Sequence, residues 1–236
     1  MRRTPLLALL AAALAAGCGS SKSTPGTSSN VPAKRAGFTA EVTNPWFPLR
    51  PGSVYRYRGV KDGKPSREVV TVTHRTKTID GAPTVVVSDH LYIDGKLEER
   101  TSDYYSQDAH GTVWYFGEDT AELDPNGKVT TREGTWHSGR DGAKPGIFMY
   151  AAPRVGQSAR QEYLKGNAED HFAVIATGRS VTVPFRRFGD VLLTKEWTPL
   201  EPGVLDHKYY ARGIGTVLEQ TVKGGDERNE LVSFHH

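Results

Sequence analysis

The sequence predicts an all-β fold with little helix: a single, strongly curved antiparallel meander sheet that forms a half-barrel or a barrel. Short runs rich in Val, Thr, Tyr, Phe and Trp recur along the chain, and such β-branched and aromatic residues favour strands. Turn pairs separate successive runs every 14 to 18 residues. That spacing suits sequential antiparallel strands and is too short for the helical crossovers that parallel strands need.

Each run has the length and composition of a strand, and the runs follow one another in chain order. The expected strands are Ser53–Gly59, Arg67–Ile79, Thr84–Ile93, Leu97–Gln107, Thr112–Gly117, Phe172–Thr177, Ser180–Phe185, Asp190–Thr198, Leu205–Ala211, Thr216–Val222 and Arg228–Phe234. We expect little helix, and residues 45–49 or 167–170 are the places where a short piece could form. A closed barrel would remove the exposed sheet edges, and an open sheet with one concave face is the alternative.

Four Asx-Gly pairs predict hairpin turns between these strands: Asp62-Gly63, Asp80-Gly81, Asp94-Gly95 and Asn126-Gly127. A type I′ turn needs a positive φ at both central residues, which Asp, Asn and Gly tolerate best. We therefore expect each pair to join two antiparallel neighbours.

Residues 1–17 have the features of a lipoprotein signal peptide. Arg2 and Arg3 form a positive n-region, and the apolar run after them is too short to span a bilayer. The cleavage region, residues 14–18, reads Leu-Ala-Ala-Gly-Cys and resembles the lipobox of bacterial lipoproteins. This resemblance implies that Cys18 is lipidated with palmitate-type acyl chains and becomes the first mature residue. The alternative is an ordinary export signal, with Cys18 left as a free thiol or removed.

Composition divides the rest of the precursor into two parts. Residues 18–37 are rich in Ser, Thr, Gly and Pro, which predicts a lipidated flexible tether. Residues 38–236 have the length of a single β domain. Cys18 is the one cysteine, so core packing and not a disulfide must hold that domain together. We expect an extracytoplasmic protein, anchored to a membrane by the lipid at Cys18.

The charge of the mature chain argues against nucleic acid as a partner. The 30 Lys and Arg residues of the precursor fall to 28 once Arg2 and Arg3 are removed, against 27 Asp and Glu. A near-neutral domain lacks the basic surface that phosphate backbones attract.

Two motifs at the ends of the domain carry a further resemblance. Residues 45–53 read Pro-Trp-Phe-Pro-Leu-Arg-Pro-Gly-Ser, and residues 209–215 read Tyr-Tyr-Ala-Arg-Gly-Ile-Gly. Together with the segments 103–108 and 113–118 they resemble a group of uncharacterised bacterial exported proteins and lipoproteins. In topology this group is loosely similar to the half-barrel of periplasmic lipoprotein carriers, in which a curved sheet holds acyl chains. The resemblance implies a β domain and supplies no catalytic residues.

No catalytic residues are predicted. The sequence contains no His-Glu-x-x-His, no Gly-x-Ser-x-Gly elbow and no phosphate-binding loop. We therefore expect a non-enzymatic protein without a resident cofactor.

An acidic segment is the one candidate metal site. Glu118, Asp119 and Asp124 lie near the Asn126-Gly127 turn, and Ca²⁺ prefers such oxygen ligands. The alternative is a solvated acidic loop, because the spacing of an EF-hand is absent. A carboxylate-based or calcium-dependent glycan hydrolase is the least favoured function.

Aromatic residues recur in most of the expected strands, and alternation places half of them on the concave face. The candidate ligand-binding residues are Tyr57, Tyr105, Trp114, Phe116, Trp197 and Tyr209. They predict a binding module for an apolar or amphipathic ligand such as a lipid. The alternative is a structural envelope lipoprotein in which the sheet is filled solid and its exposed face binds another protein.

Overall fold

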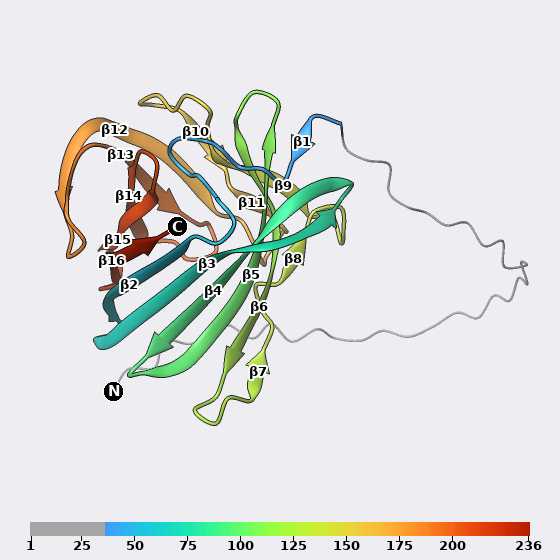
Figure 1. Cartoon of the computed structure of the whole chain (residues 1–236). Coiled ribbons are helices and arrows are strands. Elements are labelled where there is room, and N and C mark those ends of the chain that lie inside the picture. The colour runs from blue at the N-terminus through green and yellow to red at the C-terminus, as the bar shows by residue number, and fades with distance from the viewer. Residues whose placement is uncertain (1–35) are drawn as a thin grey trace, which may run out of the picture. The chain divides into compact units, whose positions relative to one another are not determined.

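The computed structural model describes residues 36–236, drawn in colour in Figure 1. The predicted signal peptide, Cys18 and nearly all of the predicted tether lie outside the described residues. Residues 36–236 contain no helix, and so none with the length and apolar character that crossing a bilayer requires.

The sheet consists of ten long strands and several short ones. The long strands are β2 (Val54–Lys61), β3 (Lys64–Ile79), β4 (Ala82–Ile93), β5 (Lys96–Asp108), β6 (Val113–Leu123), β12 (His171–Thr182), β13 (Arg187–Trp197), β14 (Leu205–Ala211), β15 (Gly215–Lys223) and β16 (Arg228–His235). The short strands are β1 (Phe38–Thr39), β7 (Val129–Thr131), β8 (Trp136–His137), β9 (Lys144–Met149), β10 (Ser158–Arg160) and β11 (Glu162–Tyr163). Two expected strands, 172–177 and 180–185, merge into β12, with register shifts along its pairing to β13.

Neighbouring long strands follow one another in chain order and pair antiparallel, which confirms the predicted meander. The path runs from β12 to β16 and continues from β2 to β6, because the last strand, β16, pairs with the first long strand, β2. Leu231 lies opposite Tyr57 in this closing register. Strands from the two ends of the domain therefore lie side by side, as Figure 1 shows.

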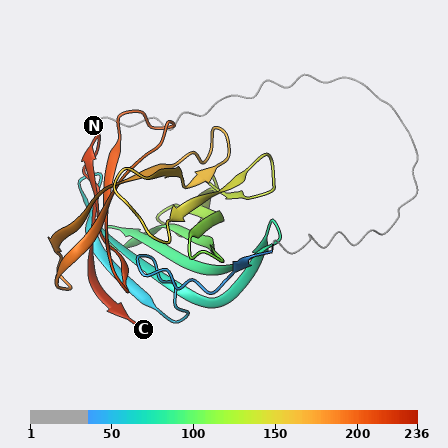
Figure 2. The same ribbon diagram turned by 90° about the horizontal axis from the view of Figure 1, so that it is seen from above.

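The sheet is nearly closed into a barrel with a seam. β10 pairs with β12 at one end of the path, and β11 pairs with β9 at the other. Gln161 is the one residue between β10 and β11, so the two ends of the sheet meet there. Seen from above, the strands curl around a common interior (Figure 2). Of the two predicted forms, the structure has the barrel-like one.

Three of the four predicted type I′ turns are confirmed. Asp62, Asp80 and Asp94 have φ values of 52°, 47° and 50°, and the glycine after each also has a positive φ. Asn126-Gly127 does lie between two antiparallel neighbours, β6 and β7, but the predicted turn type was wrong. Only Gly127 has a positive φ there, and a longer loop is closed by the hydrogen bond from Asp124 N–H to Lys128 C=O at 2.9 Å.

Neither of the two places where a short helix could form is helical. At residues 45–49 the chain first makes a turn, closed by a hydrogen bond from Phe47 N–H to Asn44 C=O at 3.2 Å. It then forms an antiparallel bridge between Leu49 and Val42. Proline at 45 and 48 removes backbone donors that a helix would use. Residues 167–170 contain a similar bridge, from Ala168 to Leu164.

Residues 40–53, which we call the strap, connect opposite sides of the barrel. The Asn44 side-chain amide donates to the backbone carbonyls of Gly111 at 2.8 Å and Tyr150 at 3.0 Å. The next residue, Pro45, accepts a hydrogen bond from Gly213 N–H at 2.7 Å, in the turn between β14 and β15. The strap therefore crosses one end of the barrel and is fixed on both sides.

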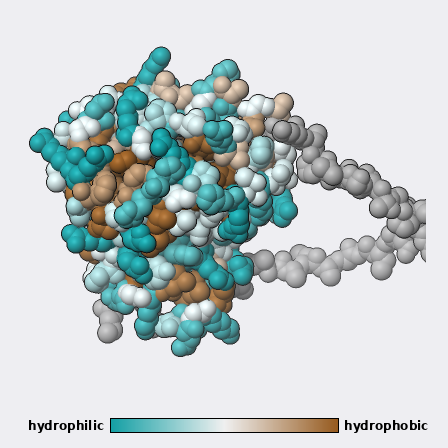
Figure 3. Space-filling view, in the orientation of Figure 1, coloured by the Kyte–Doolittle hydropathy of each residue, from teal (hydrophilic) through white to brown (hydrophobic). Residues whose placement is uncertain are grey.

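The main hydrophobic core fills much of the barrel and includes Phe172, Leu192 and Leu231, each at most 1% exposed. A second, smaller cluster contains Tyr104 and Phe116 on the opposite face of the sheet. On the face that Figure 3 shows, hydrophobic residues reach the surface in small groups separated by hydrophilic ones.

Candidate ligand-binding cavity

The barrel interior contains a cavity of about 150 Å³, bounded at one end by the strap. One part of its wall is apolar and aromatic, and the other part is charged. The apolar part includes Phe47, Leu49, Tyr55, Tyr57, Val87, Tyr105 and Phe148. The charged and polar part consists of Glu68, Asp89, Asp103, Lys208, Glu219 and Asn229. The cavity is therefore amphipathic.

Strand alternation explains why both kinds of residue face inward. Residues two apart on a strand share a face, so Asp89 points to the same side as Val87, and Asp103 to the same side as Tyr105. The register between β4 and β5 places Val87 opposite Asp103. The pairing of β3 with β4 places Val70 opposite Asp89. Acidic side chains of neighbouring strands therefore gather at one level of the barrel.

The aromatic wall is built by ring contacts between the strap and the sheet. Phe47 packs edge-on against Tyr105 with ring centroids 5.3 Å apart, and its ring lies 4.4 Å from that of Phe148. Tyr105 also stacks on Tyr115 at 4.7 Å. Two tyrosine hydroxyls of the interior have partners: Tyr57 Oη donates to the Thr216 carbonyl at 2.9 Å, and Tyr115 Oη donates to Asp103 at 2.6 Å.

Lys208 is the one lysine or arginine in the cavity wall. Its Nζ lies 3.0 Å from Glu196 and 3.2 Å from Glu219, so the positive charge is balanced within its own part of the wall. Burial lowers the pKa of Lys208, but these two carboxylates outweigh burial and raise it well above its ordinary value.

Two hydrogen-bond acceptors of the cavity wall lack a donor. The Asn229 amide donates from Nδ2 to Glu68, but its Oδ1 is buried without a partner. Asp89 Oδ1 is likewise buried and unpartnered. Asn229 is only 8% exposed, so its free acceptor is cut off from bulk water. Leaving a buried polar atom unpaired costs about 1–3 kcal/mol, so a partner for these two atoms would stabilise the interior.

The acidic groups hold their protons more tightly than in water. Burial, with the charges of Glu99 and Glu68, raises the pKa of Asp103 to about 7. Burial and the neighbouring Glu68 raise the pKa of Asp89 well above its ordinary value. Burial also raises the pKa of Glu219 to about 7, although Lys208 opposes the shift. Negative charge in this cavity is therefore costly when no cation is bound.

The structure brings two of the six predicted ligand-binding aromatics together in the cavity, Tyr57 and Tyr105. Trp114 and Phe116 lie in the second core cluster, where Phe38 packs edge-on against both rings. Tyr209 is partly buried against the main core and is not part of the cavity wall.

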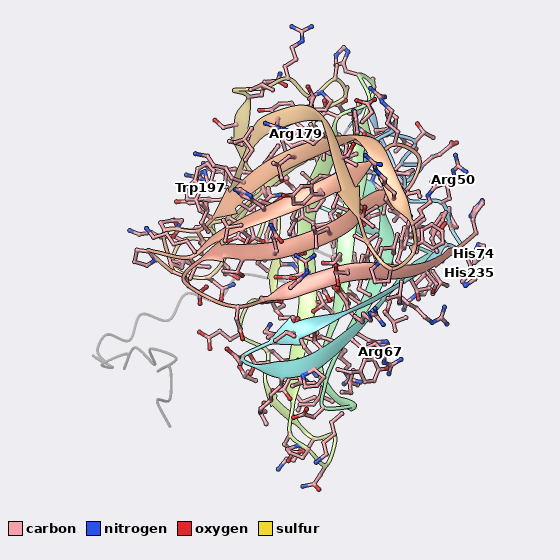
Figure 4. All side chains as sticks on the ribbon, turned by 90° about the vertical axis from the view of Figure 1, so that its left-hand side faces the viewer. Arg50, Arg67, His74, Arg179, Trp197 and His235 are labelled. Carbon is pink, nitrogen blue, oxygen red and sulfur yellow. The ribbon has the colours of Figure 1, made fainter. Side chains whose placement is uncertain are left out.

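Trp197, the sixth predicted aromatic, is the last residue of β13 and lies at one side of the molecule in Figure 4. It stacks on His171 with ring centroids 5.5 Å apart. It also borders a separate depression formed with Thr198, Pro199 and Leu205. It does not meet the interior cavity.

The three predicted metal ligands do not converge. Glu118 accepts a hydrogen bond from Tyr115 Oη at 3.1 Å. Asp119, on the opposite face of β6, lies 2.9 Å from both Lys77 Nζ and His137 Nε2. Asp124 Oδ1 accepts the N–H groups of Asn126 and Lys128 in the loop. Across residues 36–236, no group of three or more His, Cys, Asp or Glu side chains is arranged to hold a metal ion.

The charged and polar residues of the cavity were not predicted from the sequence: Glu68, Asp89, Asp103, Lys208, Glu219 and Asn229. A signal for some of them was present. In β3, Glu68 falls in phase with Val70 and Val72, and in β4 Asp89 falls in phase with Val85 and Val87. A charged residue that falls on the same strand face as buried apolar residues is a candidate for the interior.

Fold and cavity together define a class of protein: an antiparallel β-barrel with a charged, amphipathic cavity inside. No protein-family model and no curated protein sequence matches this chain. Among solved structures it is similar to the crystal structure of a candidate lipoprotein from Parabacteroides distasonis, with 14% sequence identity and a TM-score of 0.47. The match covers 80% of this chain and 98% of the other. At this level of similarity, neither a family nor a function transfers.

Proposed function

We propose that this chain is an exported lipoprotein whose barrel is a non-catalytic binding module for a small amphipathic ligand. The lipobox-like sequence at Cys18 supports the anchor. The cavity with two buried, unpartnered acceptors supports the binding function, because a bound ligand would satisfy them. The strap supports retention, since it closes one end of the cavity.

The size of the cavity limits the ligand. An engineered apolar cavity of about 150 Å³ in another protein holds one benzene molecule. Pockets for drug-sized ligands are larger, roughly 300–1,000 Å³. The cavity here, about 150 Å³, therefore suits one ring or a short chain and not a whole lipid.

Native mass spectrometry of the full chain, purified from membranes in mild detergent, tests this function. We expect a fraction of the protein to carry one small molecule. Val87→Phe fills the cavity from its wall and should abolish that mass. The matched control is Val60→Phe, at a position that is 38% exposed and outside the cavity. A chain that is always empty, and that takes up no small apolar or amphipathic compound, would contradict the proposal.

A further inference from the structure

When its carboxyl groups are ionised, the cavity has more hydrogen-bond acceptors than donors that reach them. Lys208 is shared between Glu196 and Glu219, and the Asn229 amide is committed to Glu68. Tyr115 Oη likewise donates to Asp103. Asp89 Oδ1 and Asn229 Oδ1 remain without a hydrogen. A group that completes this wall must therefore bring N–H or O–H donors of its own.

The charged residues of the cavity wall independently favour a ligand that carries N–H donors, namely a cation. Four carboxyl groups line the cavity, those of Glu68, Asp89, Asp103 and Glu219. Of these, Glu219 forms an ion pair with Lys208. In the part of the chain that the structure describes, no lysine, arginine or histidine forms an ion pair with Glu68, Asp89 or Asp103. Buried carboxylates are normally paired with a cation, and here that cation is missing from the protein itself.

The opposite wall suits the body of an organic cation. The rings of Tyr55, Tyr57 and Tyr105 border the same cavity as the three carboxylates. Aromatic rings accept apolar groups, and their faces also attract positive charge. A hydrated inorganic ion would gain nothing from this wall, whereas an amine carried on a ring or short chain would use both sides.

We propose that the cavity binds a small primary amine in its ammonium form, with the ammonium group between Asp89 and Asn229 and the apolar body against the tyrosines. This inference rests on the proposed binding function and names its ligand class. Three N–H donors match the two free acceptors and one further carboxylate, Glu68 or Asp103. Burial raises the pKa values of Asp89 and Asp103, so these carboxyl groups keep their protons when no cation is bound. A bound cation would favour their ionised form.

Isothermal titration calorimetry of the full chain in detergent, with three probes of similar size, tests the proposal. The probes are benzylamine, benzyl alcohol and toluene. We expect benzylamine to bind at least about tenfold more tightly than the two neutral compounds, because charge-assisted hydrogen bonds to buried carboxylates are the stronger kind. Equal binding of all three would overturn the cation inference and leave the binding function in place. Absence of binding by every probe would overturn both.

Variants separate the ammonium contact from general effects on the fold. Asp89→Asn keeps the shape of the side chain and removes its charge, so benzylamine affinity should fall about tenfold while toluene affinity stays unchanged. Asp103→Asn provides a second variant with the same expected pattern. The matched control is Asp141→Asn in an exposed turn outside the cavity. Unchanged benzylamine affinity in both cavity variants would overturn the inference.

Discussion

Asn229 of β16 donates a hydrogen bond from its side-chain amide to the Glu68 carboxylate of β3, although the two residues are 161 positions apart in the sequence. β2 lies between these strands, so the bond spans the place where the end of the chain closes the barrel. The same two residues line the cavity. This one contact therefore contributes both to the closure of the fold, beside the backbone pairing of β16 with β2, and to the candidate site.

Asn229→Asp should destabilise the protein. It replaces the donor to Glu68 by a second buried carboxylate of nearly the same shape. We expect the free energy of unfolding at pH 8 to fall by about 2–3 kcal/mol, the scale of an unpaired buried polar group. Urea unfolding followed by tryptophan fluorescence measures this change.

The control variant restores the hydrogen bond with donor and acceptor exchanged between positions 68 and 229. Adding Glu68→Gln to Asn229→Asp supplies a side-chain amide that donates to the new carboxylate, so most of the stability should return. If the double variant is as unstable as the single one, the contact does not hold the barrel closed.

The stability of the protein should fall as the pH rises from about 4 to about 8. Burial raises the pKa of Asp103 to about 7, and that of Glu162 to about 8 with the charge of Asp170 adding to the effect. In the unfolded chain both groups ionise near pH 4, so over this range the folded state binds more protons. Their contribution is complete below pH 4 and is lost as these groups ionise. The expected decrease is on the order of a few kcal/mol.

Thermal unfolding monitored at pH 5 and pH 8 checks this dependence, and the melting temperature should be higher at pH 5. Asp103→Asn removes one of the responsible groups and should make the two melting temperatures more similar. Wild-type protein that is more stable at pH 8 than at pH 5 would contradict the prediction.

Gly59→Ala should disturb the closing pair of strands. A Cβ at Gly59 would lie 1.5 Å from the backbone oxygen of Arg228, which a side-chain rotation cannot relieve. We expect a loss of at least about 2 kcal/mol, or roughly 4–8 °C in melting temperature for a domain of this size. Gly189→Ala is the control, because nothing lies within 4 Å of its added Cβ. Equal melting temperatures for the two variants would be inconsistent with tight closure.

Asn44→Ala should loosen the strap. The Asn44 side chain is 2% exposed, donates to Gly111 and Tyr150, and accepts the Trp46 N–H at 2.9 Å. Its removal leaves buried carbonyls without donors, at a cost of about 2–4 kcal/mol. Hydrogen exchange of residues 40–53 should accelerate more than exchange in β12 and β13. Glu41→Ala, at an exposed position of the same strap, should leave exchange unchanged.

Cys18→Ser tests the predicted anchor. The thiol of Cys18 is the expected lipid acceptor, and serine keeps its size but not its nucleophilicity. We expect the variant to move from the membrane fraction to the soluble fraction, and the acyl mass on the N-terminal peptide to disappear. Ser21→Ala is the matched control and should stay with the membrane. Wild-type protein without an acyl mass would contradict lipidation.

Much of the fold followed from local sequence. The turns at Asp62, Asp80 and Asp94 depend on two residues each, so their type could be predicted without knowledge of the rest of the chain. Tyr57 and Tyr105 could be proposed for the cavity because aromatic residues in strands are ordinary candidates for an interior. The Asn126-Gly127 turn was less predictable, since the side chain of Asp124 organises a longer loop.

The sequence by itself determined the long strands, their antiparallel order and most of their hairpin turns, because these depend on residues close together in the chain; it did not predict the short strands β1 and β7 to β11. Only the tertiary structure decided that Glu68, Asp89, Lys208 and Asn229 share one interior. A period of two shows which residues of a strand lie on the same face, but not which residues of distant strands meet across a barrel. That meeting depends on the register between β16 and β2. Closure in this register turns scattered charges into an acidic cavity.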